Sequence, residues 1–225
     1  MRLVLPSIST LTLHALLVLL FPHAANALWP QPRSLQTGST TLRLSPSSFT
    51  ITLAEFPHPP PEDLLEAVHR THAHLASDKL ARLDVSRGAA DISCRGAADD
   101  GGPVVSSRAD ADVALPRLRL RLSLDGDYGP GAASVRSIAG EARAPLGLRD
   151  EGYNLTVPVD GSEAVLSAAS ALGLFRGLNT FAQLWYYYDD GGDGGGCGPM
   201  VYMLTAPVMI EDWPAYVRLV AVWND

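Results

Sequence analysis

Residues 171–185 read Ala-Leu-Gly-Leu-Phe-Arg-Gly-Leu-Asn-Thr-Phe-Ala-Gln-Leu-Trp. Apolar residues recur there at helical spacing, and they are Ala171, Leu174, Phe175, Leu178, Phe181, Ala182 and Trp185. The residues expected on the opposite face are Arg176, Asn179, Thr180 and Gln183. This pattern predicts an amphipathic helix that lays a wide apolar face on a sheet.

A second helix is expected after Pro61. Proline and the carboxylates of Glu62 and Asp63 are favoured in a first helical turn, where the helix dipole is positive. The residues that follow at helical spacing are Leu64, Val68, Thr71 and Leu75, with Leu65 and His72 beside them. The spacing predicts a helix that runs to about Arg82 and packs one face on the sheet.

The clearest strand lies at residues 115–124. Leucine occupies positions 118, 120, 122 and 124, while arginine occupies positions 117, 119 and 121. This strict period of two predicts a strand with a buried leucine face and a solvated arginine face. Residues 153–159 alternate in the same way and predict another strand.

Several shorter segments add to the sheet. Residues 41–45 and 49–53 alternate on either side of a Pro-Ser-Ser sequence, which predicts two paired strands joined by a turn. Residues 201–205 and 207–211 suggest two short strands near the end of the chain. The periodicity of residues 164–170 fits either a helix or a strand.

Together these elements predict an α+β fold, a two-layer α/β sandwich with helices on one face of a mainly antiparallel or mixed sheet. The chain has 225 residues, of which 47% are hydrophobic and 18% charged, as expected for one globular domain. We place this domain at residues 28–211. Residues 86–113 and 126–150 are rich in glycine and small residues, and we expect both to be surface insertions.

Residues 1–27 have the layout of a secretory signal peptide. Arg2 gives a positive start, an apolar core reaches Phe21, and Ala25-Asn26-Ala27 fits a signal-peptidase site. The alternative is a membrane anchor, but the core is shorter than the ~20 apolar residues that span a bilayer. We expect a secreted, extracellular chain that begins at Leu28 and has no membrane contact, with the vacuole or lysosome as the alternative destination.

Secretion would affect two further features. Cys94 and Cys197 could pair as a disulfide in an oxidising compartment, with two free thiols as the alternative. Asn154-Leu155-Thr156 is an N-glycosylation sequon without proline in the middle position. We therefore expect a glycan on Asn154.

Charge and motifs exclude several classes of function. The chain has 17 Lys+Arg against 24 Asp+Glu, a formal net charge of −7, and its basic residues are scattered, which argues against nucleic-acid binding. A His-Glu-x-x-His motif, an EF-hand, a phosphate-binding loop and the serine and cysteine nucleophile motifs are all absent from the sequence. We expect neither a metal nor a cofactor.

Three groups of polar residues resemble metal-binding or catalytic sites. The spacing of His69, His72 and His74 on one helix prevents the three side chains from converging on a metal. Asp189, Asp190 and Asp193 lie in a glycine-rich sequence, and we interpret them as an acidic loop. Asp150 and Glu151 are adjacent acids, which we interpret as solvated loop carboxylates.

Four segments carry a family resemblance. They are Leu-Trp-Pro-Gln-Pro at 28–32, Glu-Gly-Tyr-Asn-Leu at 151–155, the sequence from Gly173 to Leu184, and Ile-Glu-Asp-Trp-Pro-Ala-Tyr at 210–216. In the same order, they resemble the N-terminal, zincin-like domain of eukaryotic, especially fungal, β-N-acetylhexosaminidases of glycoside hydrolase family 20. The resemblance implies that residues 164–170 form a strand.

The resemblance also implies an activity for the complete enzyme. Such an enzyme removes terminal N-acetylglucosamine or N-acetylgalactosamine from glycans or chitin oligosaccharides, and the acetamide of the sugar itself attacks the anomeric carbon. A glutamic acid and an aspartate that assist belong to a (β/α)₈ barrel, which needs roughly 200 residues or more. Only residues 217–225 follow Tyr216, so we expect no barrel and no catalytic residues in this chain.

Residues 212–225 would then be the truncated start of the linker to the barrel, from a truncated gene product or a misjoined reading frame. Arg218 is the candidate for a substrate-binding arginine, although glycine does not follow it as in the family. We expect an accessory domain, inactive alone, with an apolar outer surface that awaits its barrel. The alternative is a stand-alone secreted module that binds carbohydrate or protein.

Overall fold

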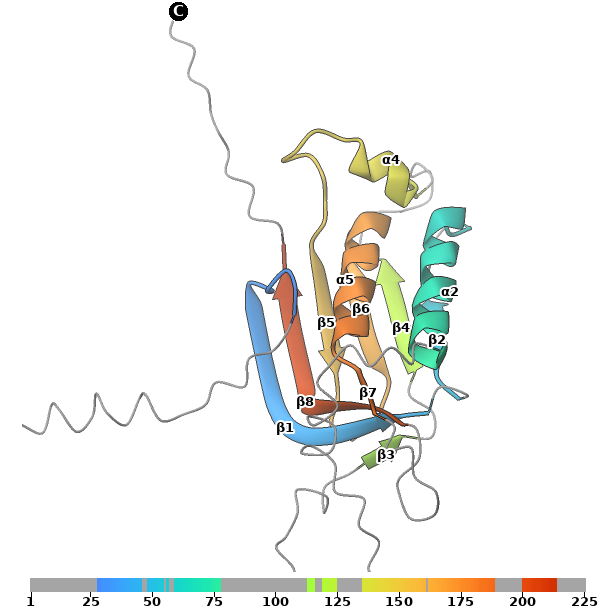
Figure 1. The fold of residues 1–225 in the computed structure, drawn as a ribbon. Coiled ribbons are helices and arrows are strands. Elements are labelled where there is room, and N and C mark those ends of the chain that lie inside the picture. The colour runs from blue at the N-terminus through green and yellow to red at the C-terminus, as the bar shows by residue number, and fades with distance from the viewer. Residues whose placement is uncertain are drawn as a thin grey trace, which may run out of the picture.

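The computed structural model of the protein describes residues 28–45, 48–54, 56, 59–77, 113–115, 119–124, 135–160, 162–188 and 200–213 (Figure 1). Several predicted features lie outside this part of the chain. They are the signal peptide at 1–27, Cys94 and Cys197, the acidic loop with Asp189, Asp190 and Asp193, and Arg218.

The described residues form a mixed sheet with helices on one face (Figure 1). The strands are β1 (Ser34–Leu44), β2 (Thr50–Ala54), β3 (Val113–Leu115), β4 (Arg119–Leu124), β5 (Tyr153–Val157), β6 (Ala164–Ala168), β7 (Tyr186–Tyr188) and β8 (Met200–Asp212). The helices are α2 (Glu62–Ser77), α4 (Ile138–Ala142) and α5 (Ala171–Gln183). None of these helices is long and apolar enough to cross a bilayer.

The strand order is β2-β4-β6-β5-β8-β1-β3, and β7 also pairs with β8. The pairs β2–β4, β4–β6 and β1–β3 are parallel, whereas β6–β5, β5–β8 and β8–β1 are antiparallel. The predicted α+β sandwich is confirmed, and so is the strand at 164–168.

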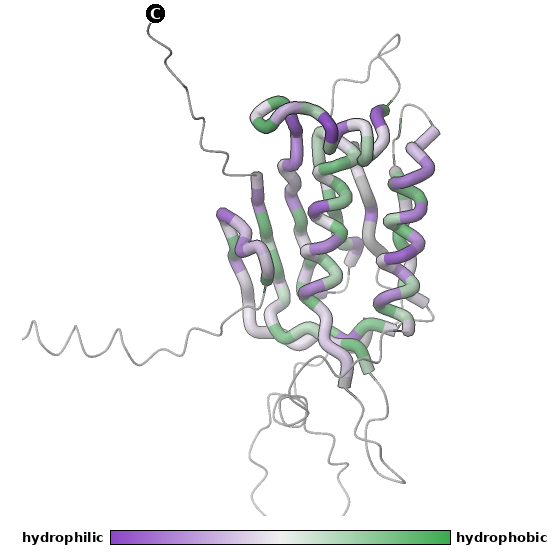
Figure 2. Tube along the Cα trace, turned by 45° about the horizontal axis from the view of Figure 1, so that its top comes forward, coloured by the Kyte–Doolittle hydropathy of each residue, from purple (hydrophilic) through white to green (hydrophobic). Residues whose placement is uncertain are grey.

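The core lies between the sheet and the pair of helices α2 and α5. Tyr153, Leu155 and Val157 of β5 are buried on this side. Leu174, Leu178 and Phe181 of α5 are fully buried against them, and each buried side chain of this size contributes about 2 kcal/mol. Hydrophobic and hydrophilic residues alternate along both helices, as Figure 2 shows.

The predicted pairing of residues 41–45 with residues 49–53 is wrong. β2 pairs with β4, while β1 pairs with β8 and β3, so the two strands lie far apart in the sheet order. The amides of Ser48 and Phe49 both donate to the carbonyl oxygen of Ser45, at 3.1 and 2.9 Å. Donors three and four residues after the acceptor differ from the hydrogen-bond pattern of a tight two-residue hairpin, which would return the chain on itself.

Residues 115–124 form parts of two strands, not one. β3 ends at Leu115 and pairs with β1, while β4 begins at Arg119 between β2 and β6. Pro116 lies between them in the sequence and has no N–H to donate to a sheet ladder. On the predicted arginine face, Arg121 is half-exposed and pairs with Glu163 at 3.0 Å.

Conversely, residues 200–212 form the single strand β8, not two short ones. Its pairing with β1 shifts register between Thr37 and Thr40, and the exposed Pro207 lies at this irregularity. A Cβ at Gly38 would lie 2.3 Å from the carbonyl oxygen of Ala206, so only glycine fits there. Proline is tolerated inside a strand at such a bulge, which is why the strand continues through it.

Candidate functional site

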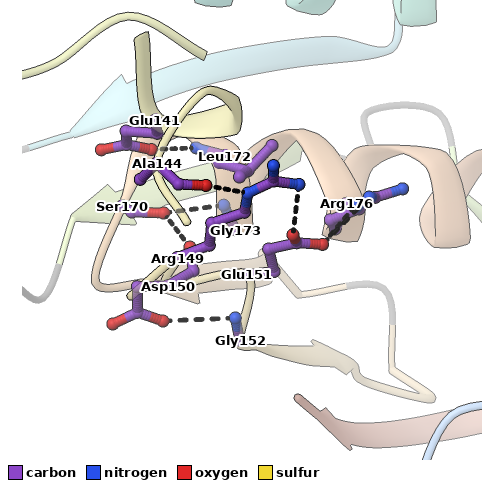
Figure 3. A network of polar contacts seen from close by, with 10 residues as sticks. All are labelled: Glu141, Ala144, Arg149, Asp150, Glu151, Gly152, Ser170, Leu172, Gly173 and Arg176. Atoms are coloured by element: carbon purple, nitrogen blue, oxygen red, sulfur yellow. Dashed lines mark hydrogen bonds and ion pairs between the residues drawn. The ribbon is translucent and has the colours of Figure 1, made fainter. Parts of the chain in front are cut away.

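Two of the segments that carry the family resemblance meet in space, one around β5 and the other along α5. We call the contact between residues 149–153 and residues 170–180 the motif junction (Figure 3). It lies where the chain enters β5 and where α5 begins, next to α4 (Figure 1). The junction contains Glu151 and Arg176, the charged residues of these two segments.

Glu151 is the centre of the motif junction. Its side chain is 7% exposed, and its Oε2 accepts a hydrogen bond from Nε of Arg176 at 3.0 Å. The same oxygen forms an ion pair with Nη2 of Arg176 at 2.9 Å. Nη1 of Arg149 lies 3.9 Å from Oε1 of Glu151 on the other side (Figure 3). Two cations therefore face one buried carboxylate, the arrangement that makes burial of a charge tolerable.

The interpretation of Asp150 and Glu151 as solvated loop carboxylates is wrong for Glu151. Asp150 is exposed as expected, and its Oδ1 accepts from the amide of Gly152 at 3.3 Å. The two adjacent carboxylates thus have different surroundings and different partners (Figure 3). They do not form an acid pair that faces a common ligand.

The N-terminus of α5 is capped from two sides. Ser170 Oγ accepts from the amide of Gly173 at 2.9 Å and donates to the carbonyl oxygen of Asp150. Glu141, from α4, accepts from the amide of Leu172 at 2.8 Å. These bonds satisfy N–H groups that a helix end otherwise leaves without an intrahelical partner. Partial burial raises the pKa of Glu141 above 4.5, although the bond from Leu172 acts in the opposite direction.

Residues 126–150 were expected to form a surface insertion, and this contact corrects that prediction for their second half. Residues 135–150 are described, and within them Val135 is buried and α4 contacts α5. Ser137 caps α4 by accepting from the amide of Gly140 at 3.0 Å. The second half of the segment therefore packs against the domain and contributes Glu141 to the cap of α5.

Tyr153 and Thr180 join β5 to the middle of α5. Tyr153 Oη and Thr180 Oγ1 share a hydrogen bond of 2.7 Å, and both residues are buried. The prediction that Thr180 lies on the exposed face of α5 is therefore wrong, because its hydroxyl has a partner inside the core. Burial, together with the nearby charge of Asp212, raises the pKa of Tyr153 to about 12.

This raised pKa predicts a loss of stability in alkali. The unfolded chain releases the Tyr153 proton near pH 10, whereas the folded chain holds it to about 12. The free energy of unfolding should therefore be unaffected below pH 10 and fall by up to about 1.4 kcal/mol per pH unit between the two values. Tyr153→Phe should remove this fall, at a cost of about 1 kcal/mol at neutral pH for the lost hydrogen bond.

Urea unfolding between pH 8 and pH 12 measures the difference between the two chains. Thr180→Val is the matched control, because it removes the same hydrogen bond but keeps the phenol and its alkaline fall. If the free energy of unfolding falls equally with pH in the wild type and in Tyr153→Phe, the prediction is contradicted.

Two glycines of α5 allow the helix to lie close to the sheet. A Cβ at Gly173 would lie 2.4 Å from the carbonyl oxygen of Gly152. A Cβ at Gly177 would lie 2.2 Å from Cδ1 of Leu166, on β6. The glycines of the α5 motif thus have a packing function, and they bring Arg176 within reach of Glu151.

The end of β8 is held from both sides. Tyr153 pairs with Asp212 in the sheet, and the amide of Arg33 donates to Oδ1 of Asp212 at 3.1 Å. The guanidinium of Arg33 lies over the ring of Trp213, with its carbon 5.1 Å from the ring centroid, close enough for a cation–π interaction. The last described residues therefore leave the domain from a fixed position.

The remaining candidates form no second site among the described residues. His72 Nε2 lies 2.9 Å from the carbonyl oxygen of Phe49, and its ring stacks on that of Phe49. The described part of the chain contains no group of three His, Cys, Asp or Glu side chains that could hold a metal ion. Asn154, the sequon residue, is exposed on β5.

The acids and the motifs are recognisable in the sequence, but the two pairs that join the motifs are not. Glu151–Arg176 and Tyr153–Thr180 each connect one motif with the other. The signal was present, since each motif carries one partner of each pair. In each pair the polar groups of the two side chains bind each other, which favours a structural role for the motif junction.

Residues 28–184 match a protein-family model described as beta-acetyl hexosaminidase like. The chain belongs to this family. The hexosaminidase-like family of glycoside hydrolase family 20 expected from the motifs is thereby confirmed, while a eukaryotic or fungal origin stays a prediction. A comparison of this hexosaminidase-like chain with curated proteins gives no match.

Solved structures similar to the hexosaminidase-like chain include Flavobacterium johnsoniae chitobiase, with 17% identity over 84% of this chain and a TM-score of 0.42. A Vibrio harveyi exo β-N-acetylglucosaminidase in complex with N-acetylglucosamine has 12% identity over 85% and a TM-score of 0.39. Streptomyces plicatus N-acetyl-β-hexosaminidase has 21% identity over 88% and a TM-score of 0.36. The chain spans only 21%, 19% and 28% of those three proteins, respectively.

Proposed function

We propose that this chain is the accessory N-terminal domain of a β-N-acetylhexosaminidase-like glycoside hydrolase. The complete enzyme would remove terminal N-acetylhexosamine from glycans or chitin oligosaccharides by substrate-assisted, retaining hydrolysis. The observation that carries the proposal is the motif junction: the residues typical of the family bind one another and hold β5 against α5. The role of the domain is to support a catalytic barrel that lies outside residues 28–213.

The acids of the motif junction do not fit the catalytic chemistry. Glycoside hydrolysis needs a carboxylic acid that reaches the leaving oxygen, with a second acid or the sugar's own acetamide on the anomeric carbon. Glu151 has a guanidinium group beside each of its two oxygens, and Asp150 binds the amide of Gly152. We therefore assign neither acid to the reaction, and the catalytic pair belongs to the barrel.

The place where the chain leaves the domain supports a docking role. Arg33 and β5 fix the end of β8, so a barrel that follows Trp213 would start from a defined position. The loop after α4 lies at the same end of the sheet (Figure 1). Leu146, Leu148 and Trp213 expose 66%, 77% and 45% of their surface. Large exposed apolar side chains of this kind suit contact with another domain.

We also propose that the chain enters the secretory pathway, which the charge and apolar pattern of residues 1–27 supports. Detection of Leu28 as the N-terminal residue of protein recovered from the medium tests this. Recovery of a chain that begins at Met1 would contradict it.

The activity proposal is tested with 4-nitrophenyl N-acetyl-β-glucosaminide. We expect the purified 28–225 chain to release no 4-nitrophenol above the blank. The same residues 28–213 joined to a family 20 catalytic barrel should release it. Arg176→Met in this fusion should lower the temperature of thermal inactivation, with kcat and KM unchanged at low temperature.

Two outcomes would contradict the proposal. Release of 4-nitrophenol by the isolated chain would place catalysis within it, and loss of that release in Asp150→Asn would identify the acid. Specific binding of N-acetylglucosamine oligomers by the isolated chain, with no effect on a joined barrel, would favour a stand-alone binding module.

A further inference from the structure

We infer that Asn154 carries an N-linked glycan and that the open face of the sheet, the face opposite α2 and α5, stays in solvent in the mature protein. This inference rests on the proposed entry into the secretory pathway, and it is independent of the hydrolase assignment. It concerns the sequon Asn154-Leu155-Thr156 on β5 and the side chains beside it.

The alternation of β5 separates the sequon from the core. Asn154 and Thr156 are exposed, while Tyr153, Leu155 and Val157 are buried under the helices. Successive side chains of a strand point to opposite faces, so both sequon side chains lie on the open face. The helices α2 and α5 cover only the other face (Figure 1).

The neighbouring strands leave room around Asn154. In the register of the sheet Asn154 pairs with Ser167 of β6 and with Glu211 of β8. Side chains directly opposite one another lie about 5 Å apart, so these two are the nearest on the open face. Ser167 is small and Glu211 is exposed, so neither covers the amide of Asn154.

The second sequon residue has similar surroundings. Thr156 pairs with Val165 of β6 and with Met209 of β8, which is 52% exposed. Thr156 is itself exposed, so no described segment covers it. The fold therefore accommodates a glycan on Asn154 without displacement of the core.

The modification transfers an oligosaccharide from a pyrophosphate-linked lipid carrier. Nδ2 of Asn154 forms a bond to C1 of the first N-acetylglucosamine, while the bond between C1 and the pyrophosphate oxygen breaks. The electron pair leaves with the pyrophosphate, and Nδ2 gives up one proton to a base of the transferase. No oxidant or reductant is needed.

A glycan at this position has a consequence for assembly. β5 lies inside the sheet between β6 and β8, so its open-face side chains are near the middle of that face. A domain packed over the open face would bury Asn154, and the glycan excludes such packing. The helix face and the ends of the sheet remain available for a partner domain.

The test is secretion of the full 225-residue chain from a eukaryotic host. Peptide-N-glycosidase should increase the electrophoretic mobility of the secreted chain by one step and turn the Asn154 side chain into aspartate, which peptide mass spectrometry detects. Asn154→Gln and Thr156→Ala should both abolish this step. Thr156→Ser should retain it, because serine preserves the sequon.

A displaced sequon tests the face itself. Met209→Asn with Glu211→Thr, in the Asn154→Gln background, places a sequon on β8 beside the original one. Restoration of the single step is expected, because both new side chains lie on the open face. Secretion of this variant without a glycan would overturn the solvent-facing assignment.

A second leader distinguishes the possible failures. If residues 1–27 do not direct secretion, a secretory signal of known function in their place should still yield a glycan on Asn154; that result contradicts only the secretion proposal. Unmodified Asn154 in chain secreted by either leader overturns the inference. Activity of the isolated chain would contradict the accessory function and leave the glycan unaffected.

Discussion

Gly173→Ala should destabilise the fold by about 3 kcal/mol, at the upper end of the usual cost of overpacking. The added Cβ would lie 2.4 Å from the carbonyl oxygen of Gly152 and 2.9 Å from Cβ of Ala168. Neither atom is at the end of a flexible side chain, so the start of α5 must move away from Gly152 and from Ala168 of β6. Alanine stabilises a helix by about 1 kcal/mol relative to glycine. A net loss of stability therefore means that the steric cost of the added Cβ is larger than this gain.

Chemical denaturation of Gly173→Ala and the wild type measures this loss. Gly140→Ala is the matched control, because Gly140 is also helical but exposed, and its Cβ would meet only Ser137 Oγ, at 3.1 Å. We expect that control to lie within about 1 kcal/mol of the wild type. Gly177→Ala should fall between the two, since its clash is with a methyl group of Leu166. Equal stability of Gly173→Ala and Gly140→Ala would show that the motif junction can relax.

The local elements were predictable because their patterns are local. The apolar stripe of α5 and the alternation of β5 appear within single segments, and the structure contains both elements. The strand pairing was not predictable in this way. Residues 41–45 and 49–53 are close in sequence, which favours a hairpin, yet β2 finds its partner in β4 and β1 in β8.

In the motif junction, too, the local motifs were predictable and the contacts between them were not. Glu151 and Arg176 were visible as parts of motifs, but nothing in their sequence positions brings them together. Burial of Glu151 depends on where β5, α4 and α5 meet, and a loop acid without that context looks solvated. Thr180 was assigned to the polar face because a hydroxyl counts as polar, although its partner Tyr153 is in the core.

The ion pair at the centre of the motif junction predicts an asymmetric response. Arg176→Met should cost about 3 kcal/mol, because it removes the hydrogen bond and the ion pair that Arg176 makes with a carboxylate that is only 7% exposed. Glu151→Gln should cost less, about 1–2 kcal/mol, since the side chain of Arg176 is 49% exposed and can be hydrated. Both values are differences in the free energy of unfolding from urea denaturation.

The double variant Arg176→Met with Glu151→Gln decides whether the pair acts as a unit. Its cost should be below the sum of the single costs by about 1–2 kcal/mol, because the carboxylate that needs the arginine is gone. Arg70→Met is the control: Arg70 pairs with Glu66 on the surface of α2, with side chains 70% and 66% exposed, and such pairs contribute about 0.5 kcal/mol. If Arg176→Met costs no more than Arg70→Met, or if the single costs are additive, the pair does not hold β5 to α5, and Tyr153, Thr180 and the glycines would account for the motif junction without it.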